Sequence, residues 1–80
     1  MATVGEHIKW ARLSRDPPLR LVDVAGDALS AGMLSKIERG LVSPSLSTLS
    51  YLAQRLGVPL ARLFEDERET EAVARAAVLN

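Results

Sequence analysis

The chain has 80 residues, 48% of them hydrophobic, and its ten basic and ten acidic side chains give a formal net charge of zero. This length suits one small domain, and a composition rich in Leu, Ala and Val with only three aromatic residues favours packed helices over a β-sandwich or barrel. The absence of cysteine excludes disulfides and thiolate zinc sites and indicates a cytoplasmic protein, and no apolar run or N-terminal signal pattern predicts a membrane partner.

The charges are unevenly distributed along the chain. Residues 1–62 carry eight Lys and Arg against five Asp and Glu, whereas residues 63–80 carry two against five. The acidic end is either a solvated helix face or a means of keeping the tail away from phosphates. The basic excess of the body is too small to indicate nucleic-acid binding by itself.

Two helices are predicted before residue 30. Thr3 and Glu6 fit a capping box that begins the first helix, and the segment 15–18, with two prolines, ends it. The second helix is expected over residues 20–28. Apolar residues recur at helical spacing in both helices and are predicted to face the core: Val4, Ile8, Ala11, Leu21, Val24, Ala25 and Ala28.

The segment 30–40 predicts a short helix with one buried stripe and one bare outer face. Ser30 is a suitable N-cap, and Gly40 supplies the left-handed residue that ends a helix. Leu34 and Ile37 are three residues apart and point to the same side. Small residues followed by cations occupy the other side: Ala31, Gly32, Ser35, Lys36 and Arg39.

Two further helices complete the predicted domain, which spans residues 1–64. The fourth begins at the Ser45 cap, ends at Gly57 and is expected to bury Leu46, Leu49, Leu52, Ala53 and Leu56. Pro59 suits the first turn of the fifth, whose Leu60, Leu63 and Phe64 are expected to cover the base of the core. Residues 65–80 form a separate tail, in which 67–79 favours a helix with a thin apolar stripe. The tail is a frayed end, a dimerisation helix or the beginning of a larger sensor domain.

The order of these segments resembles that of a known family. The chain resembles the lambda repressor/Cro-type helix-turn-helix (XRE family) DNA-binding domain over about residues 4–64. Three segments in this order carry the resemblance: Ser30 to Gly40, Ser43 to Leu49 and Leu56 to Phe64. The resemblance implies an all-α, compact five-helix bundle. It also implies a transcriptional regulator that binds double-stranded DNA at an inverted repeat as a homodimer, with helix 30–39 in the major groove.

The resemblance assigns DNA contacts along the third helix. Ser30 stands where its hydroxyl meets a phosphate or a base edge, whereas Ala31 and Gly32 replace long polar side chains and make direct base readout there poor. Gly32 either permits close approach to the backbone or reflects sequence drift, and Met33 either touches a thymine methyl or pads the junction with helix two. Ser35 and Lys36 are the stronger candidates, with Lys36 reaching guanine or phosphate and Arg39 the backbone. The alternative is that both cations are solvated at a helix C-terminus.

The resemblance also assigns phosphate contacts at two helix starts. These are Arg20 and Leu21 on one side and Ser43, Ser45 and the Leu46 amide on the other. Arg20 replaces a small cap residue, which is expected to weaken the cap but to add a cation. Ser43 and Ser45 also serve as turn and cap residues.

An ion pair and a shortened turn are expected to affect the arrangement of the helices rather than the DNA-binding surface. The resemblance implies a partly buried ion pair between Arg12 and Glu38 that ties the first helix to the third. The turn after Ala28 lacks a residue, because Leu29 follows where the family carries glycine, and about two extra residues stand at 15–18. The angle between helices two and three, and the depth of Ser30 in the groove, are therefore left open.

The sequence predicts no catalytic residue, no cofactor and no metal site. His7 is the only histidine and is expected to be a solvated surface residue, and the acidic group around Glu67 lacks the spacing and glycine of a calcium loop. The serious alternative to DNA binding is a protein-interaction module with the same fold. A bare Ala31–Gly32 face, zero net charge and expected exposure of Trp10, Leu41 and Val42 favour it.

Overall fold

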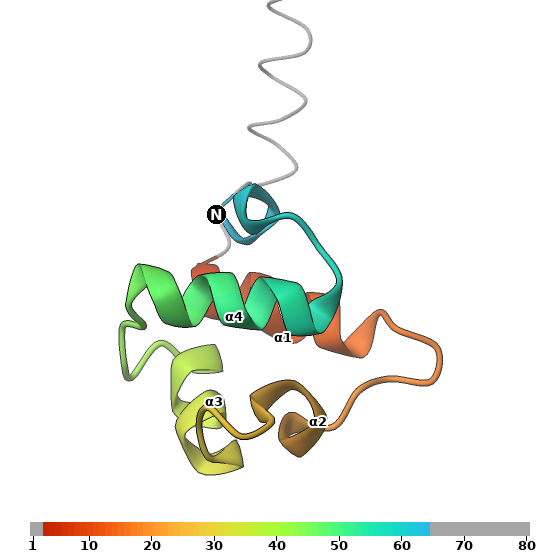
Figure 1. The fold of residues 1–80 in the computed structure, drawn as a ribbon, viewed down its shortest axis with the longest axis horizontal. Helices are drawn as coiled ribbons and strands as arrows, with labels where there is room; N and C mark the ends of the chain where they lie inside the picture. The colour runs from red at the N-terminus through yellow and green to blue at the C-terminus, as the bar shows by residue number, and fades with distance from the viewer. Residues whose placement is uncertain (1–2, 65–80) are drawn as a thin grey trace, which may run out of the picture.

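The computed structural model describes residues 3–64, and within them every regular secondary-structure element is a helix. The elements are α1 (Val4–Leu13), α2 (Leu21–Ala25), α3 (Ala31–Glu38), α4 (Leu46–Leu56) and the short 3-10 helix η1 (Leu60–Leu63) (Figure 1). The all-α prediction is confirmed for these residues, but the segment expected as a fifth α-helix is a single 3-10 turn. The helix expected over 67–79 lies outside the described residues.

The predicted N-cap hydroxyls are present because they depend only on neighbouring residues, although the Glu6 carboxylate accepts from the Thr3 hydroxyl, at 3.4 Å, and not from the Thr3 backbone amide as in the predicted capping box. The hydroxyls of Thr3, Ser30 and Ser45 accept hydrogen bonds from backbone amides three residues later, at 3.2, 3.0 and 3.2 Å. Gly57 ends α4 in the left-handed region at φ 72°. Local chemistry therefore sets where these three helices begin and where α4 ends.

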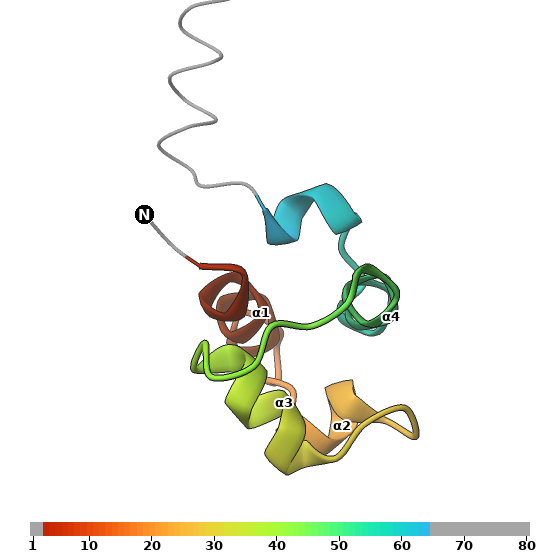
Figure 2. The same ribbon diagram turned by 90° about the vertical axis from the view of Figure 1, so that its left-hand side faces the viewer.

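The helices form two layers around one core. Figure 2 shows α1 and α4 side by side and nearly end-on, with α3 and α2 beneath them and η1 above. Helix α3 packs against α1, and α2 packs against α4 and α3. The largest fully buried side chains come from every element: Ile8, Val24, Leu34, Leu52, Leu56 and Leu63.

Three residues predicted to face the core are exposed instead. Leu46 and Phe64 retain 65% and 50% of their accessible surface, and Ala28 is also exposed. Leu46 is the first residue of α4, one turn before Leu49 enters the core, and Phe64 follows the last residue of η1. Helical spacing predicts which face of a helix is apolar, but it does not predict that the neighbouring helices end before these positions.

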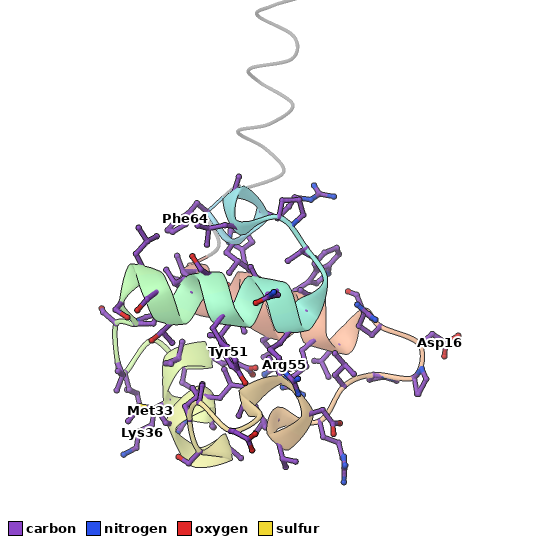
Figure 3. The ribbon with its side chains drawn as sticks, in the orientation of Figure 1. Asp16, Met33, Lys36, Tyr51, Arg55 and Phe64 are labelled. Carbon is purple, nitrogen blue, oxygen red and sulfur yellow. The ribbon has the colours of Figure 1, made fainter. Side chains whose placement is uncertain are left out.

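Helix α2 is shorter than predicted. It ends at Ala25 rather than Ala28, because Gly26 takes a positive φ of 56° and leads the chain into a loop. Two side chains of α4 hold this end. The Tyr51 hydroxyl donates to the Ala25 carbonyl at 3.0 Å, and the Arg55 guanidinium donates to the Asp23 carbonyl, so that both reach from α4 toward α2 (Figure 3).

Helix α1 approaches the C-terminal end of α3 closely at Gly5. A Cβ at this buried position would lie 2.7 Å from the Glu38 carbonyl oxygen and still closer to that of Ile37. Glycine is therefore needed here for space and not for a special backbone angle.

Of the helices between residues 3 and 64, none is long and apolar enough to cross a membrane.

Candidate nucleic-acid interface

The outer face of α3 is a line of exposed residues opposite its buried stripe. Leu34 and Ile37 are buried, whereas Gly32, Lys36 and Arg39 are exposed and follow one another at spacings of four and three. Lys36 extends away from the other helices (Figure 3). The Arg39 Nε lies 3.4 Å from the Ser35 carbonyl oxygen, which keeps the guanidinium stem at the helix end. This face is free of packing and carries positive charge without an acidic residue.

The first turn of α3 is polar only at its cap. The Ser30 hydroxyl accepts from the Met33 amide at 3.0 Å, and its own proton remains for donation. Ala31 is half-buried, and Gly32 is exposed. Met33 retains 39% of its surface, and Ser35 is half-buried on the flank of the helix. A ligand at this turn meets a hydroxyl donor and otherwise apolar or bare backbone surface.

An open groove separates α3 from the start of α4. Its volume is about 410 Å³, and it is bordered by the α2–α3 turn, by Met33, by the loop with Ser43 and by the cap Ser45. The Ser45 hydroxyl lies 3.1 Å from that of Ser47 and 3.0 Å from that of Thr48, so several hydroxyls gather at this helix start. The groove therefore brings together three predicted site residues: Met33, Ser43 and Ser45.

Arg20, at the start of α2, is held by an acidic neighbour rather than left free. Its Nε and Nη2 atoms bind the two Asp23 carboxylate oxygens at 3.1 and 3.0 Å, and its backbone amide donates to the same carboxylate at 2.9 Å. As expected for a weak cap, the Arg20 side chain accepts no hydrogen bond from the first amides of α2, but the Asp23 carboxylate at the third helical position accepts one from the Arg20 backbone amide. Hydrogen bonding to Arg20 lowers the pKa of the Asp23 carboxyl.

Leu21 follows Arg20 and contributes backbone rather than side chain to this surface. It is half-buried and packs against the core. Its amide, in the first turn of α2, is the atom that faces a ligand in the predicted arrangement. Arg20 and Leu21 do not border the groove between α3 and α4.

Arg12 and Glu38 form a buried ion pair that joins α1 to α3. The Arg12 Nε and Nη2 atoms lie 2.8 and 2.9 Å from the Glu38 carboxylate oxygens. The third nitrogen, Nη1, donates to the Leu19 carbonyl at 3.0 Å. Only 11% and 5% of the two side chains are exposed, and hydrogen bonding to Glu38 raises the pKa of the guanidinium. The pair sets the position of α3 relative to α1 and to the segment before α2.

Two expectations about surface residues are corrected. His7 is half-buried, and its Nδ1 lies 2.9 Å from the Leu63 carbonyl, so it joins α1 to η1 instead of standing in solvent. Trp10 and Leu41 are exposed at 66% and 65%, but Val42 packs against the core. Within residues 3–64 no cluster of three or more His, Cys, Asp or Glu side chains is arranged to hold a metal ion.

Sequence reasoning missed the side chains that fix α2. Tyr51 and Arg55 lie four residues apart on α4, a spacing that places them on one face, but their acceptors are backbone carbonyls of α2. A third such contact, which does not involve α2, joins the segment after α1 to the end of α4: the Arg15 guanidinium donates to the Leu56 carbonyl at 2.7 Å. Spacing could have grouped Tyr51 with Arg55, whereas no local signal identifies a carbonyl far away in the sequence.

Comparison with known proteins agrees with this geometry. The helix-turn-helix family model matches residues 8–63. The chain is 44% identical over 54 residues to the HTH-type transcriptional regulator DdrOP3 of Deinococcus deserti, covering 66% of this chain and 42% of that protein. It is 38% identical over 77 residues to the transcriptional regulator ClgR of Mycobacterium tuberculosis, covering 91% of this chain and 68% of that protein. No solved structure matches significantly. The chain belongs to the XRE-type helix-turn-helix family.

Proposed function

We propose that this domain binds double-stranded DNA sequence-specifically and regulates transcription, with α3 as its recognition helix. The observation that carries the proposal is the unpacked outer line of Gly32, Lys36 and Arg39 on a helix-turn-helix frame. An exposed helix face of this width and charge suits the major groove. The relatives named transcriptional regulators support the same function.

The contacts divide between bases and phosphates. Lys36 extends away from the other helices and reaches guanine or a phosphate, while Ser35 precedes it in the sequence and Arg39 contacts the DNA backbone at the helix end. Ser43, Ser45 and the first amides of α4 form one phosphate contact, and Arg20 with the Leu21 amide forms another. Because Asp23 engages the Arg20 guanidinium on one edge, Arg20 meets phosphate with its remaining donors.

The domain is proposed to act as a homodimer at an inverted repeat. One eight-residue helix contacts only a few base pairs, so two copies are needed for a specific site. Their recognition helices would then stand about 34 Å apart, which is one turn of the duplex. Residues 1–64 are proposed as the binding domain, and residues 65–80, which lie outside the described part of the chain, as a frayed tail, a dimerisation helix or the beginning of a sensor domain. The protein acts in the cytoplasm, where bacterial DNA lies.

Selection from random duplexes, followed by anisotropy titration, tests this function. The enriched duplex is titrated at about 50 and 200 mM salt with the wild-type chain, Lys36→Ala and the control Gln54→Ala, whose residue is exposed on α4. We expect affinity to fall steeply with salt and the slope to decrease by about one in Lys36→Ala. If no duplex is enriched and the chain shows no salt-dependent binding to the random duplexes, the proposed function is excluded for this chain.

A protein-interaction module is the second candidate, and one observation favours it. Trp10, Leu41 and Leu46 each expose about two thirds of a large apolar side chain. An apolar interface of this kind changes little with salt, whereas phosphate binding weakens. The titration at two salt concentrations therefore separates the two candidates.

A further inference from the structure

The first turn of α3 contains no side chain that distinguishes bases by paired hydrogen bonds. Ser30 uses its hydroxyl oxygen as the helix cap and has one proton to donate. Ala31 and Gly32 have no polar side-chain atom, and the Met33 thioether is a weak acceptor. The bidentate contacts by which Arg, Asn or Gln identify a base are therefore absent from this turn. Apart from the single hydroxyl donor of Ser30, this turn offers only shape and apolar contact for recognition.

Gly32 leaves an empty position on the outer line of the helix. Apart from the adjoining residues and backbone of its own helix, a Cβ built there would have a single neighbour within 4 Å, the Ser30 Oγ at 3.9 Å. Gly32 is not among the glycines with positive φ, so the backbone does not require it either. Gly5 differs, because a Cβ there collides with two carbonyls. The fold thus explains Gly5 and offers no internal reason for Gly32.

We propose that the bare surface at Gly32, bordered by Met33, receives the C5 methyl of a thymine in the major groove. The inference rests on the proposed DNA binding and names the base that this turn selects. The thymine methyl is the apolar group that unmodified base pairs present in the major groove. Met33 is the next residue along the helix, retains 39% of its surface and borders the groove toward α4, so it supplies a flexible, polarisable wall on that side of the bare surface.

The position of Lys36 extends the inference to a spacing. Lys36 follows Gly32 by one helical turn on the same outer line, about 6 Å along the helix axis. Base pairs are stacked about 3.4 Å apart, so the two residues are roughly two base steps apart. Each half-site is therefore expected to contain a thymine and, about two steps away, the guanine or phosphate that meets Lys36.

Replacement of thymine by deoxyuridine tests the inference, because it removes the methyl and leaves the hydrogen-bonding edge unchanged. Each thymine of the enriched duplex is replaced in turn, and the full chain is titrated as wild type, as Gly32→Ala and as the control Ser50→Ala on the exposed face of α4. We expect one replacement per half-site to weaken wild-type binding about fourfold, which corresponds to one buried methyl.

The Gly32→Ala variant gives the second readout. Its added methyl occupies the proposed place of the thymine methyl, so it should bind the thymine duplex more weakly than the wild type does and bind the uracil duplex at least as tightly as the thymine duplex. Ser50→Ala should keep the full fourfold preference. Thermal unfolding of Gly32→Ala at or above the wild-type temperature shows that weakened binding is not misfolding, since the added Cβ has space.

The outcomes separate this inference from the function beneath it. DNA binding without sensitivity to any uracil replacement, or a Gly32→Ala variant that keeps the preference for thymine, overturns the inference and leaves DNA binding in place. A random pool from which no duplex is enriched overturns both.

Discussion

The two ends of α3 are built in opposite ways. The C-terminal end is held against α1 by the buried pair of Arg12 and Glu38 and by the close approach at Gly5. The N-terminal turn, with Gly32 and Met33, is exposed and meets little of the protein. One end thus fixes the direction of the helix, and the other end is left available for a ligand.

The largest expected effect comes from removing one partner of the buried pair. Glu38→Ala leaves the Arg12 guanidinium buried without its carboxylate and should lower the free energy of unfolding by about 3–5 kcal/mol. Urea unfolding followed by circular dichroism measures the loss. The double variant Arg12→Met with Glu38→Ala is the control, and it should be clearly more stable than Glu38→Ala alone. Equal stability of the two variants would contradict the importance of this pair.

Gly5→Ala tests the close approach itself. The added Cβ meets the carbonyls of Ile37 and Glu38, so α1 must shift, and we expect a loss of roughly 1–3 kcal/mol in the free energy of unfolding. The same urea titration measures it. If Gly5→Ala were as stable as the wild type, α1 and α3 would not be in the contact described.

Gly32→Ala is the matched substitution at the other end of the comparison and should have the opposite sign. Alanine is a better helix former than glycine, and the added Cβ finds open space, so we expect a gain of up to about 1 kcal/mol. Thermal unfolding should show a rise of at most a few degrees. A destabilised Gly32→Ala variant would mean that the first turn is packed and not exposed.

The smallest effect is a pH dependence at the start of α2. Hydrogen bonding to Arg20 holds the pKa of Asp23 below its ordinary value of 3.8. The ionised carboxylate therefore stabilises α2 above pH about 4, and this contribution is lost as the pH falls through the lowered pKa. The protection of the Leu21–Ala25 amides against exchange, measured by NMR and corrected for the intrinsic exchange rate at each pH, should decrease on acidification. Asp23→Asn should show the lower protection already at neutral pH, and high salt should reduce the difference between the two proteins because the pair is exposed.

Much of the fold was predictable because its signals are local. The caps at Ser30 and Ser45 need only an amide three residues later, and the stripe of Leu34 and Ile37 follows from helical spacing. The errors concern elements whose fate depends on a partner. Ala28 lies outside α2 because the helix ends at Gly26, and Leu46 is exposed because its turn precedes the packed part of α4.

The candidate site was predictable in composition but not in arrangement. The sequence shows a bare face on α3, and the structure adds the groove that joins Met33 to Ser43 and Ser45. The sequence places Arg20 at a helix start, and the structure shows that Asp23 already binds its guanidinium. Such details require the distances between side chains, which spacing along the chain does not contain.

By itself, the sequence determined the helical class, the family and the starts of the main helices, because propensity, capping and periodicity act over a few residues. Only the tertiary structure decided that His7 binds the Leu63 carbonyl, that α3 approaches α1 closely at Gly5 and that Gly32 faces open space. These facts depend on which backbone atoms approach from distant parts of the chain. Gly5 and Gly32 both stand in the first turn of a helix, and they differ in the atoms that surround them in the folded protein.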